Sequence, residues 1–361
     1  MLLRIPVIAL ATCILAYGQQ QRIVFDQPLL IVNDGKYGFI DHSGNVMIKP
    51  QFYWSSDFSD GFATVYVCGN LASINPSGKI QAHRLEMNSG LALRRNGSGT
   101  GYVDSSGRFQ IPPKYEDGLP FSEGLAAVKM GDKWGFVDAD GRLVIAPRFA
   151  AAYYFVEGVA IADLGESHVL INRTGNVVAD GFDHLWSIGD GRVLVSQRQK
   201  WGFIDFGGNV RVPLIYDGAR DGFQGGLTSM VKDGKWGYLD RNGGVVIPFQ
   251  FGDAGPFFAN SLPPAKIGKK TGFIDRSGNF KFLLPYRSSP GFVYGDVAPF
   301  WTEDGRFGYV NASGKIIWGP AAESPDHAPI LGWTEKDKLK SCDGISVTVR
   351  TLVANLATVE D

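Results

Sequence analysis

One motif returns at nearly constant spacing through most of this chain of 361 residues. Clear copies are KWGFVD at 133–138, KWGFID at 200–205 and KWGYLD at 235–240, and a related KYGFID occupies 36–41. A later glycine ends the motif in clear and degenerate copies alike, at positions 44, 78, 107, 141, 175, 208, 243, 278 and 314. Apart from one shorter gap, these glycines are 33 to 36 residues apart. The spacing predicts nine tandem units of about 34 residues each.

Helical repeats share a period of 34 residues, so the residue pattern has to decide between helices and strands. In the unit at 124–149, short runs of β-branched and aromatic residues occupy 124–130, 133–138 and 142–146. Glycine, aspartate and asparagine separate these runs, which is typical of strands joined by tight turns. Glycine is also unusually frequent, at 47 of 361 residues, and glycines this closely spaced disfavour helices. Each unit is therefore predicted to be a meander of about three strands.

Two tight turns are predicted within each unit. Residues 130–133 are expected to form a hairpin turn, and residues 138–141 a second one. In the second turn, we expect Asp138 to bond to the local backbone and Gly141 to adopt a positive φ. A proline follows the third run, and because proline cannot donate to a ladder, we expect it to end the third strand. These prolines are Pro50, Pro147, Pro213, Pro248 and Pro285.

A meander this small cannot bury its apolar face alone, so we expect each unit to pack on the next. The aromatic residue before the motif glycine is predicted to be a wedge between neighbouring units. These residues are Tyr37, Trp134, Trp201, Trp236 and Phe307. The expected fold class is all-β, with nine meanders stacked as a solenoid or superhelix, and the alternative is a closed array like a β-propeller.

The KWGFVD-type core, the preceding FSEGLA at 121–126 and the trailing I-x-P-x-F pattern resemble the WG repeat family, also called KWG repeats. The resemblance covers about 26–319. It implies a bacterial β-repeat protein, often exported, with no activity assigned to the repeat and no catalytic residues to transfer. The motif departs from its pattern at five positions, where Ala72 and Val169 replace the glycine and Thr100, His168 and Thr271 replace the aromatic residue.

The two ends of the chain differ from the repeats. Arg4, the apolar run after it and the small residues up to Gly18 are typical of a secretory signal peptide, so residues 1–18 are expected to be removed. The run is too short for a membrane span, so no stable span is expected after cleavage. A lipoprotein acylated at Cys13 is a less favoured alternative. Residues 320–361 lack the motif and are expected to form a C-terminal cap, or else a tail.

Residues that could support catalysis or bind a metal are sparse. A balance of 35 basic against 36 acidic residues, a net charge of −1, gives no surplus for binding nucleic acid. The five histidines lack zinc-ligand spacing, and the repeated Asp or Asn of the second turn, such as Asp138, fits a turn better than a calcium loop. Cys68 and Cys342 are either a disulfide or two separate thiols. We therefore expect no enzyme activity, no cofactor and no metal.

The segments between the third strand and the next unit vary most, and variable residues on a fixed scaffold commonly form binding sites. The alternative is that their aromatic side chains fill the core between repeats. We expect a non-enzymatic, exported scaffold that binds a protein at the cell envelope, in the periplasm or outside the cell. A carbohydrate-binding protein is the alternative, and a hydrolase whose acids converge from several repeats is the least favoured hypothesis. The candidate binding residues are Trp54, Tyr153, His184, Trp186 and Trp301, and the carbohydrate hypothesis uses the three tryptophans.

Overall fold

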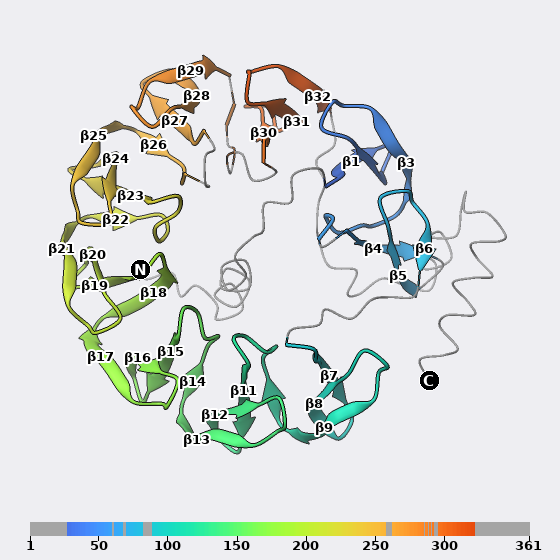
Figure 1. The fold of residues 1–361 in the computed structure, drawn as a ribbon. Coiled ribbons are helices and arrows are strands. Elements are labelled where there is room, and N and C mark those ends of the chain that lie inside the picture. Colours follow the sequence, from blue (N-terminus) through green and yellow to red (C-terminus); the bar gives the residue numbers. More distant parts are fainter. Residues whose placement is uncertain are drawn as a thin grey trace. The chain divides into compact units, whose positions relative to one another are not determined.

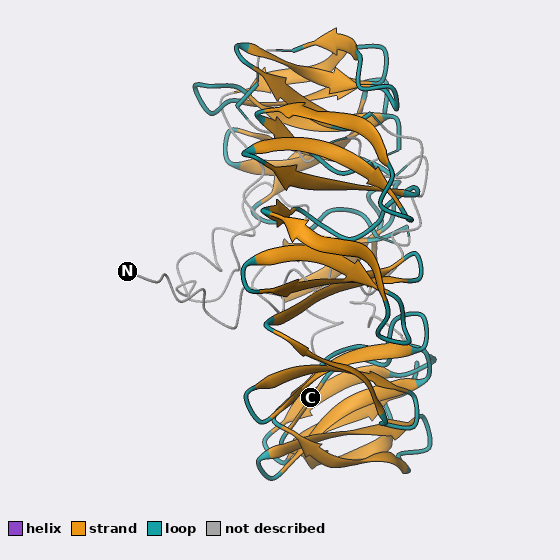
Figure 2. Cartoon of the chain, turned by 90° about the vertical axis from the view of Figure 1, so that its left-hand side faces the viewer, coloured by secondary structure: helices purple, strands orange, loops and turns teal. Residues whose placement is uncertain are grey.

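The computed structural model describes residues 27–321 except 60, 68–69, 82–88, 258–261, 285, 288, 290 and 292–294. In that part, the chain contains strands, turns and loops but no helix (Figure 2), and hence none that could cross a membrane. The strands there form nine small antiparallel sheets of three or four strands each. The all-β fold class is therefore confirmed. The predicted signal peptide, the three cysteines, Pro285 and all but the first two residues of the predicted cap lie outside the described residues.

The chain divides into two compact units, and most of their strands are labelled in Figure 1. The strands of unit 1 lie between Leu85 and Ala259 and are β7 (Ala92–Asn96), β8 (Gly99–Val103), β9 (Phe109–Tyr115), β10 (Asp117–Gly118), β11 (Leu125–Met130), β12 (Lys133–Asp138), β13 (Leu143–Phe149), β14 (Ala151–Ala152), β15 (Val159–Leu164), β16 (Ser167–Asn172), β17 (Val177–Phe182), β18 (His184–Gly189), β19 (Arg192–Gln197), β20 (Lys200–Ile204), β21 (Val210–Tyr216), β22 (Gly218–Ala219), β23 (Leu227–Lys232), β24 (Lys235–Asp240), β25 (Val245–Phe251) and β26 (Asp253–Ala254).

Unit 2 combines residues from both ends of the described chain, Ile23–Arg84 and Asn260–Asp361. Its strands are β1 (Leu29–Asn33), β2 (Lys36–Ile40), β3 (Val46–Phe52), β4 (Ala63–Val67), β5 (Asn70–Ile74), β6 (Ile80–Gln81), β27 (Pro264–Ile267), β28 (Lys270–Ile274), β29 (Phe280–Leu283), β30 (Val297–Trp301), β31 (Phe307–Asn311) and β32 (Ile316–Ala321).

The sheet of β10, β11, β12 and β13 illustrates how the motif folds. β11 and β12 pair from Leu125↔Asp138 to Met130↔Lys133, which leaves a two-residue hairpin turn. In the second turn, the Asp138 carboxylate accepts hydrogen bonds from the backbone N–H groups of Asp140 and Arg142, at 3.0 and 2.9 Å. Gly141 has a φ of 76°. Both predicted turns are confirmed.

The prediction that proline ends the third strand is wrong. Pro147 lies inside β13, where Trp134 pairs with Phe149 and Phe136 pairs with Ile145. Three residues of β13 therefore bulge opposite Gly135 alone. Proline is tolerated at such a bulge on an edge strand because its missing N–H is not needed by the ladder. Pro50, Pro213 and Pro248 also lie inside their third strands, β3, β21 and β25.

The bulge also explains the motif glycine. A Cβ on Gly135 would lie 2.5 Å from the carbonyl oxygen of Ile145 and 2.8 Å from the nitrogen of Pro147, closer than side chains approach backbone atoms. The valine of the degenerate copy, Val169, sits opposite a bulge with one residue fewer, since His168 pairs with Phe182 and Leu170 with Ala179. The motif glycine is therefore needed where the third strand has a bulge of three residues opposite it.

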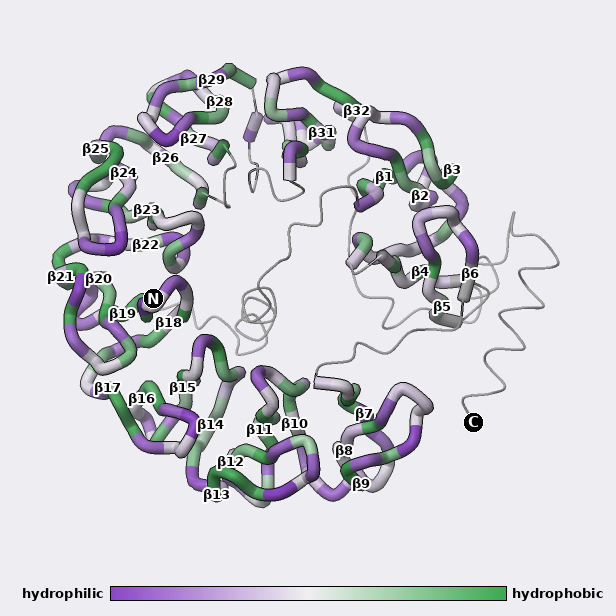
Figure 3. The backbone as a smooth tube through the Cα atoms, viewed as in Figure 1, coloured by the Kyte–Doolittle hydropathy of each residue, from purple (hydrophilic) through white to green (hydrophobic). Residues whose placement is uncertain are grey.

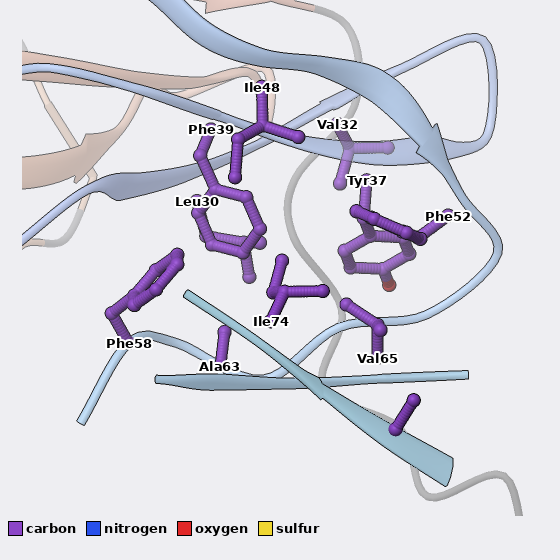
Figure 4. Close-up of a cluster of buried hydrophobic side chains, with 11 residues drawn as sticks. Leu30, Val32, Tyr37, Phe39, Ile48, Phe52, Phe58, Ala63, Val65 and Ile74 are labelled. Carbon is purple, nitrogen blue, oxygen red and sulfur yellow. The ribbon is translucent and has the colours of Figure 1, made fainter. Parts of the chain in front are cut away.

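Neighbouring sheets within each unit share their hydrophobic cores, as predicted. One cluster combines residues of β1–β3, among them Leu30 and Phe39, with Phe58, Ala63 and Ile74 of the next segment and sheet (Figure 4). Hydrophobic residues recur along the strands of each meander, whereas many turns are hydrophilic (Figure 3). Burial against the next sheet supplies the stability that a single meander lacks.

In most sheets of the described residues, the residue at the centre of the shared core is the aromatic one after the motif glycine. Phe39, Phe136 and Phe203 are at most 1% exposed, as are Tyr102 and Tyr238. Each packs against an aromatic residue from the segment before the first long strand of the next sheet, with ring centroids 4.6 to 4.9 Å apart. The residue before the glycine was predicted to be this wedge, but Trp134, Trp201 and Trp236 are only half-buried, and Tyr37 and Phe307 are buried.

The first and last described sheets pack on each other within unit 2. Their common cluster consists of Leu29, Ile31, Ile40, Val297, Phe307 and Tyr309. The Tyr309 hydroxyl donates to the Leu30 carbonyl at 2.9 Å, in the way that Tyr102 donates to Leu119 at 2.7 Å in unit 1. A Cβ added to the turn residue Gly44 would also meet Ile317 of β32, as one added to Gly141 would meet Ile111 of the preceding third strand. The contact between the terminal sheets therefore repeats the contact between sequential ones.

Replacing Tyr309 with phenylalanine is expected to lower the free energy of unfolding by about 1–3 kcal/mol, because the buried Leu30 carbonyl loses its donor. Tyr102→Phe is the matched variant, since it removes the equivalent bond between sequential sheets. Urea unfolding followed by circular dichroism measures both. A neutral Tyr309→Phe together with a destabilising Tyr102→Phe would show that the terminal sheets do not pack together in solution.

Acid is expected to weaken the second turn of the β20–β21 pair. Burial opposes ionisation of Asp205, but hydrogen bonds from Asn209, Arg211 and Gly207 outweigh it and lower its pKa to about 2. Because this pKa is below the unfolded value of about 3.9, the contribution of Asp205 to stability is present above pH ~4 and is lost as the pH falls toward 2. Asp205→Asn should be less stable than the parent chain at pH 7, and the difference should shrink by pH 3. Denaturant unfolding at both pH values tests this, and a difference independent of pH would contradict it.

Candidate functional site

A row of partly exposed ring side chains runs along one side of unit 1. Trp134, His168, Trp201 and Trp236 occupy the same position in four sheets, on β12, β16, β20 and β24, and all four are half-buried. Each lies beside the turn that joins the first two long strands of its meander. We call these four residues and the adjoining turns the hairpin face of unit 1. Since the four sheets have equivalent registers, their rings point to the same side.

The buried side of this row rests on the cores between sheets. Trp134 packs at the edge of the cluster that contains Phe136 and Phe155, and Trp201 at the edge of the one that contains Phe203. The remaining ring surface of each tryptophan is open to solvent. The row therefore combines a fixed position with accessible aromatic area, which is typical of residues that anchor a partner.

Acidic side chains hold the turns of the hairpin face in place. The carboxylate of Glu116, in the segment before β10, accepts the Gly131 N–H at 2.8 Å. Asp183 does the same for Arg198 at 2.5 Å, and Asp217 for Asp233 at 2.7 Å. In each case, the acidic residue comes directly after the third strand of one meander, and its carboxylate binds the first hairpin turn of the next meander. These bonds pre-order the face, which reduces the entropy that binding would cost.

Charged groups also surround the tryptophans. Lys200 donates to Asp217 at 2.6 Å, and this hydrogen bond lowers the Asp217 pKa. The Arg220 guanidinium lies over the Trp236 ring, 4.9 Å from its centroid, and is paired with Asp253. Exposed ion pairs of this kind contribute little to stability, but they orient the side chains that a partner would meet.

The predicted binding residue His184 belongs to a histidine cluster, which we define as Asp163, His168 and His184, and the predicted residue Tyr153 lies near Asp163. Asp163 bonds to His168 with 2.7 Å between Oδ1 and Nδ1, and the His168 and His184 ring centroids are 5.7 Å apart. Burial and the negative charge of Asp163 raise the pKa of Tyr153. Asp163 and His168 were not among the site residues predicted from the sequence. The feature of the sequence that could have indicated this cluster is His168, which replaces the aromatic residue of the motif.

Among the predicted binding residues of unit 1, Trp186 and His184 are exposed, whereas Tyr153 is half-buried. Trp186 lies on β18 inside a register shift, since Leu185 pairs with Val195 and Ile188 with Val193. The side chain is 38% exposed. A bulge commonly re-aims a side chain in this way, and here it turns an indole toward solvent two residues after His184.

The other two predicted binding residues belong to unit 2. Trp301, at the end of β30, is half-buried and contacts the buried Phe307, with ring centroids 5.0 Å apart. This contact matches the core-filling alternative. Trp54 follows β3 and is half-buried, and its Nε1 is buried without a hydrogen-bond partner. The five predicted residues are therefore divided between the two units.

A family model described as "WG containing repeat" matches the chain six times and covers more than half of it. The matches are residues 37–70, 101–134, 134–166, 170–201, 201–236 and 236–270. The chain belongs to the WG repeat family. Two of these WG matches adjoin the histidine cluster but leave out residues 167–169, which include His168 and Val169. The cluster thus lies where the WG motif is interrupted.

Comparison with solved structures shows the fold alone. A structure described as a eukaryotic initiation factor aligns with a TM-score of 0.53 and 10% identity, over 81% of this WG repeat chain and 94% of the other. BamB from Moraxella catarrhalis aligns with a TM-score of 0.38 and 13% identity, over 66% and 89%. PorZ from Porphyromonas gingivalis aligns with a TM-score of 0.28 and 11% identity, over 82% and 51%. Comparison with curated protein sequences gives no match.

Proposed function

We propose that this WG repeat protein is an exported, non-enzymatic scaffold that binds a protein partner at the cell envelope through the hairpin face of unit 1. The observation that supports it most is the row of Trp134, Trp201 and Trp236 at one equivalent position in separate repeats. Tryptophan and arginine are enriched at the energetic centres of protein interfaces, and Arg220 lies over Trp236 in this row.

The arrangement of the repeats is part of this proposal. The nine sheets of the described residues support nine meanders in tandem. Within unit 2, the first and last sheets pack on each other in the way that sequential sheets do. A continuous set of repeats would present its turns at regular intervals, which suits an extended protein partner.

Export is proposed from the character of residues 1–18. Expression of the full chain in a bacterial host, followed by fractionation and intact mass measurement, tests this part. We expect the protein in the periplasm or the medium, about 18 residues shorter than the translated chain. Full-length protein in the cytoplasmic fraction would contradict export.

Two variants test the binding face. Trp201→Ala combined with Trp236→Ala removes exposed aromatic area from the hairpin face, and Arg142→Ala is the control in the turns at the other end of the strands. A partner is first identified by cross-linking in the envelope fraction of the native organism, and its affinity for the purified variants is then measured by biolayer interferometry. We expect the double tryptophan variant to bind at least about 30-fold more weakly, as for an interface hot spot, and the Arg142 variant to bind as the parent does.

A loss of affinity can be assigned to the hairpin face only if the variants are folded, so circular dichroism spectra and melting curves are measured for each variant. Unchanged affinity in a folded double tryptophan variant would overturn the proposed face. Carbohydrate binding is the second candidate, favoured by the exposed Trp186 beside His184. A glycan array tests it, because a scaffold that binds only proteins gives no signal there.

A further inference from the structure

We propose that His168 and His184 form a binding site for a divalent late transition metal ion, with copper(II) bound most tightly. The two histidines come from adjacent meanders of unit 1, His168 from β16 and His184 from β18. They are two of the five histidines in the chain, and their rings are in contact, with centroids 5.7 Å apart. This site goes beyond the proposed protein-binding function.

Asp163 determines which nitrogen of His168 is available. Its carboxylate Oδ1 lies 2.7 Å from Nδ1 of His168. An ionised carboxylate only accepts hydrogen bonds, so Nδ1 carries the proton and Nε2 of the neutral ring keeps its lone pair. A carboxylate on the far nitrogen is the usual companion of a histidine that binds a metal, because it fixes the ring and raises its basicity.

The spacing of the two rings suits a shared ion. Two imidazoles whose nitrogens lie at bonding distance from one copper(II) ion have ring centroids roughly 4.5 Å apart at neighbouring positions of a tetragonal site and roughly 6.4 Å apart at opposite positions. The observed 5.7 Å lies between these two values, and the planes are inclined by 42°. His184 is exposed, so a small rotation of its side chain closes the remaining distance. The side chain of His168 is 32% exposed, which leaves the site accessible from solvent.

The chemistry of the ligands selects the class of ion. Imidazole nitrogen suits copper, zinc and nickel, and copper(II) binds such ligands most strongly in the divalent series. Among the residues that the structure describes, no group of three or more His, Cys, Asp and Glu side chains is arranged around a metal position. Water would therefore complete the coordination, as copper(II) accepts in tetragonal sites with nitrogen and oxygen ligands.

Copper(II) titration of the purified chain tests the site. We expect one equivalent to bind, seen by calorimetry and by quenching of tryptophan fluorescence, to which Trp186 contributes through its position two residues from His184. Electron paramagnetic resonance should detect two imidazole nitrogens on the bound ion. His184→Asn should leave one nitrogen and lower the affinity by at least tenfold. Asp163→Asn should weaken binding by about 10- to 100-fold while both nitrogens remain.

His168→Trp restores the aromatic residue of the motif, so we expect it to fold and to lose the site. Asp132→Asn, in the first hairpin turn of the preceding meander, is the control and should bind copper as the parent does. Equal copper binding by the parent, His168→Trp and His184→Asn would overturn the proposal, as would a spectrum without two imidazoles. Neither result depends on a protein partner, so failure here is distinct from failure of the proposed function.

Discussion

Replacing Gly135 with alanine is expected to lower the free energy of unfolding by about 3 kcal/mol. The added methyl group would lie 2.5 Å from the Ile145 carbonyl oxygen and 2.8 Å from the Pro147 nitrogen. Both are backbone atoms of the bulge in β13, so no side-chain rotation relieves the clash. The third strand must move away from the second, which weakens the sheet and its packing on the next one.

Gly97→Ala is the matched control for this prediction. A Cβ on Gly97 meets no atom within 4 Å, and its φ lies outside the positive range that strains alanine. Its effect on stability should therefore stay within about 0.5 kcal/mol. Thermal and guanidinium unfolding of both variants measure the difference. Similar stabilities for Gly135→Ala and Gly97→Ala would show that the bulge does not require the motif glycine.

Phe136→Ala is expected to lower the free energy of unfolding by about 3–5 kcal/mol, because it leaves a cavity in the core between two sheets. Phe136 is 1% exposed and packs edge-on against Phe155, with centroids 4.9 Å apart. Trp134→Ala should cost less, since part of the Trp134 ring already faces solvent. This order reverses what the motif alone predicts, in which the residue before the glycine is the wedge.

Guanidinium unfolding of Phe136→Ala, Phe155→Ala and the double variant gives the coupling between the two rings. A coupling energy of about 0.5–1.5 kcal/mol is expected for an edge-on aromatic pair. Phe109→Ala is the control, since Phe109 is 38% exposed and its truncation should change stability little. A Trp134→Ala variant that is less stable than Phe136→Ala would contradict the assignment of the central wedge.

Much of the fold was predictable because the motif acts locally. The turn at Asp138 forms through hydrogen bonds to residues two and four positions later, and Gly141 supplies the positive φ. The hairpin between β11 and β12 likewise depends on a two-residue turn. Such interactions lie within a few residues, so their residue types and spacing are sufficient to predict them.

The place of Pro147 and the burial of Phe136 were not predictable in the same way. The proline lies in a bulge whose register depends on the pairing of β12 with β13. Periodicity cannot separate the rings on either side of Gly135, since both are aromatic. Burial distinguishes them only when the next sheet is in place and Phe155 covers one of the two.

The candidate site shows the same division. Tyr153, His184 and Trp186 stood out because they lie in the variable segments of a regular array. The partnership of His184 with His168 did not, because His184 lies on β18 and His168 on β16 of the preceding sheet. Asp163 and His168 face each other in one hairpin, but only the packing of one meander on the next brings His184 to them.

By itself, the sequence determined the all-β class, the period, the two turns of each meander and the packing of neighbouring sheets within each unit. Tertiary structure alone decided which aromatic ring occupies the core, where the third strand bulges, that the first and last sheets meet, and which polar side chains share a site. Turns and strand patterns depend on contacts over a few residues, whereas these other features depend on surfaces that exist only after the sheets have packed.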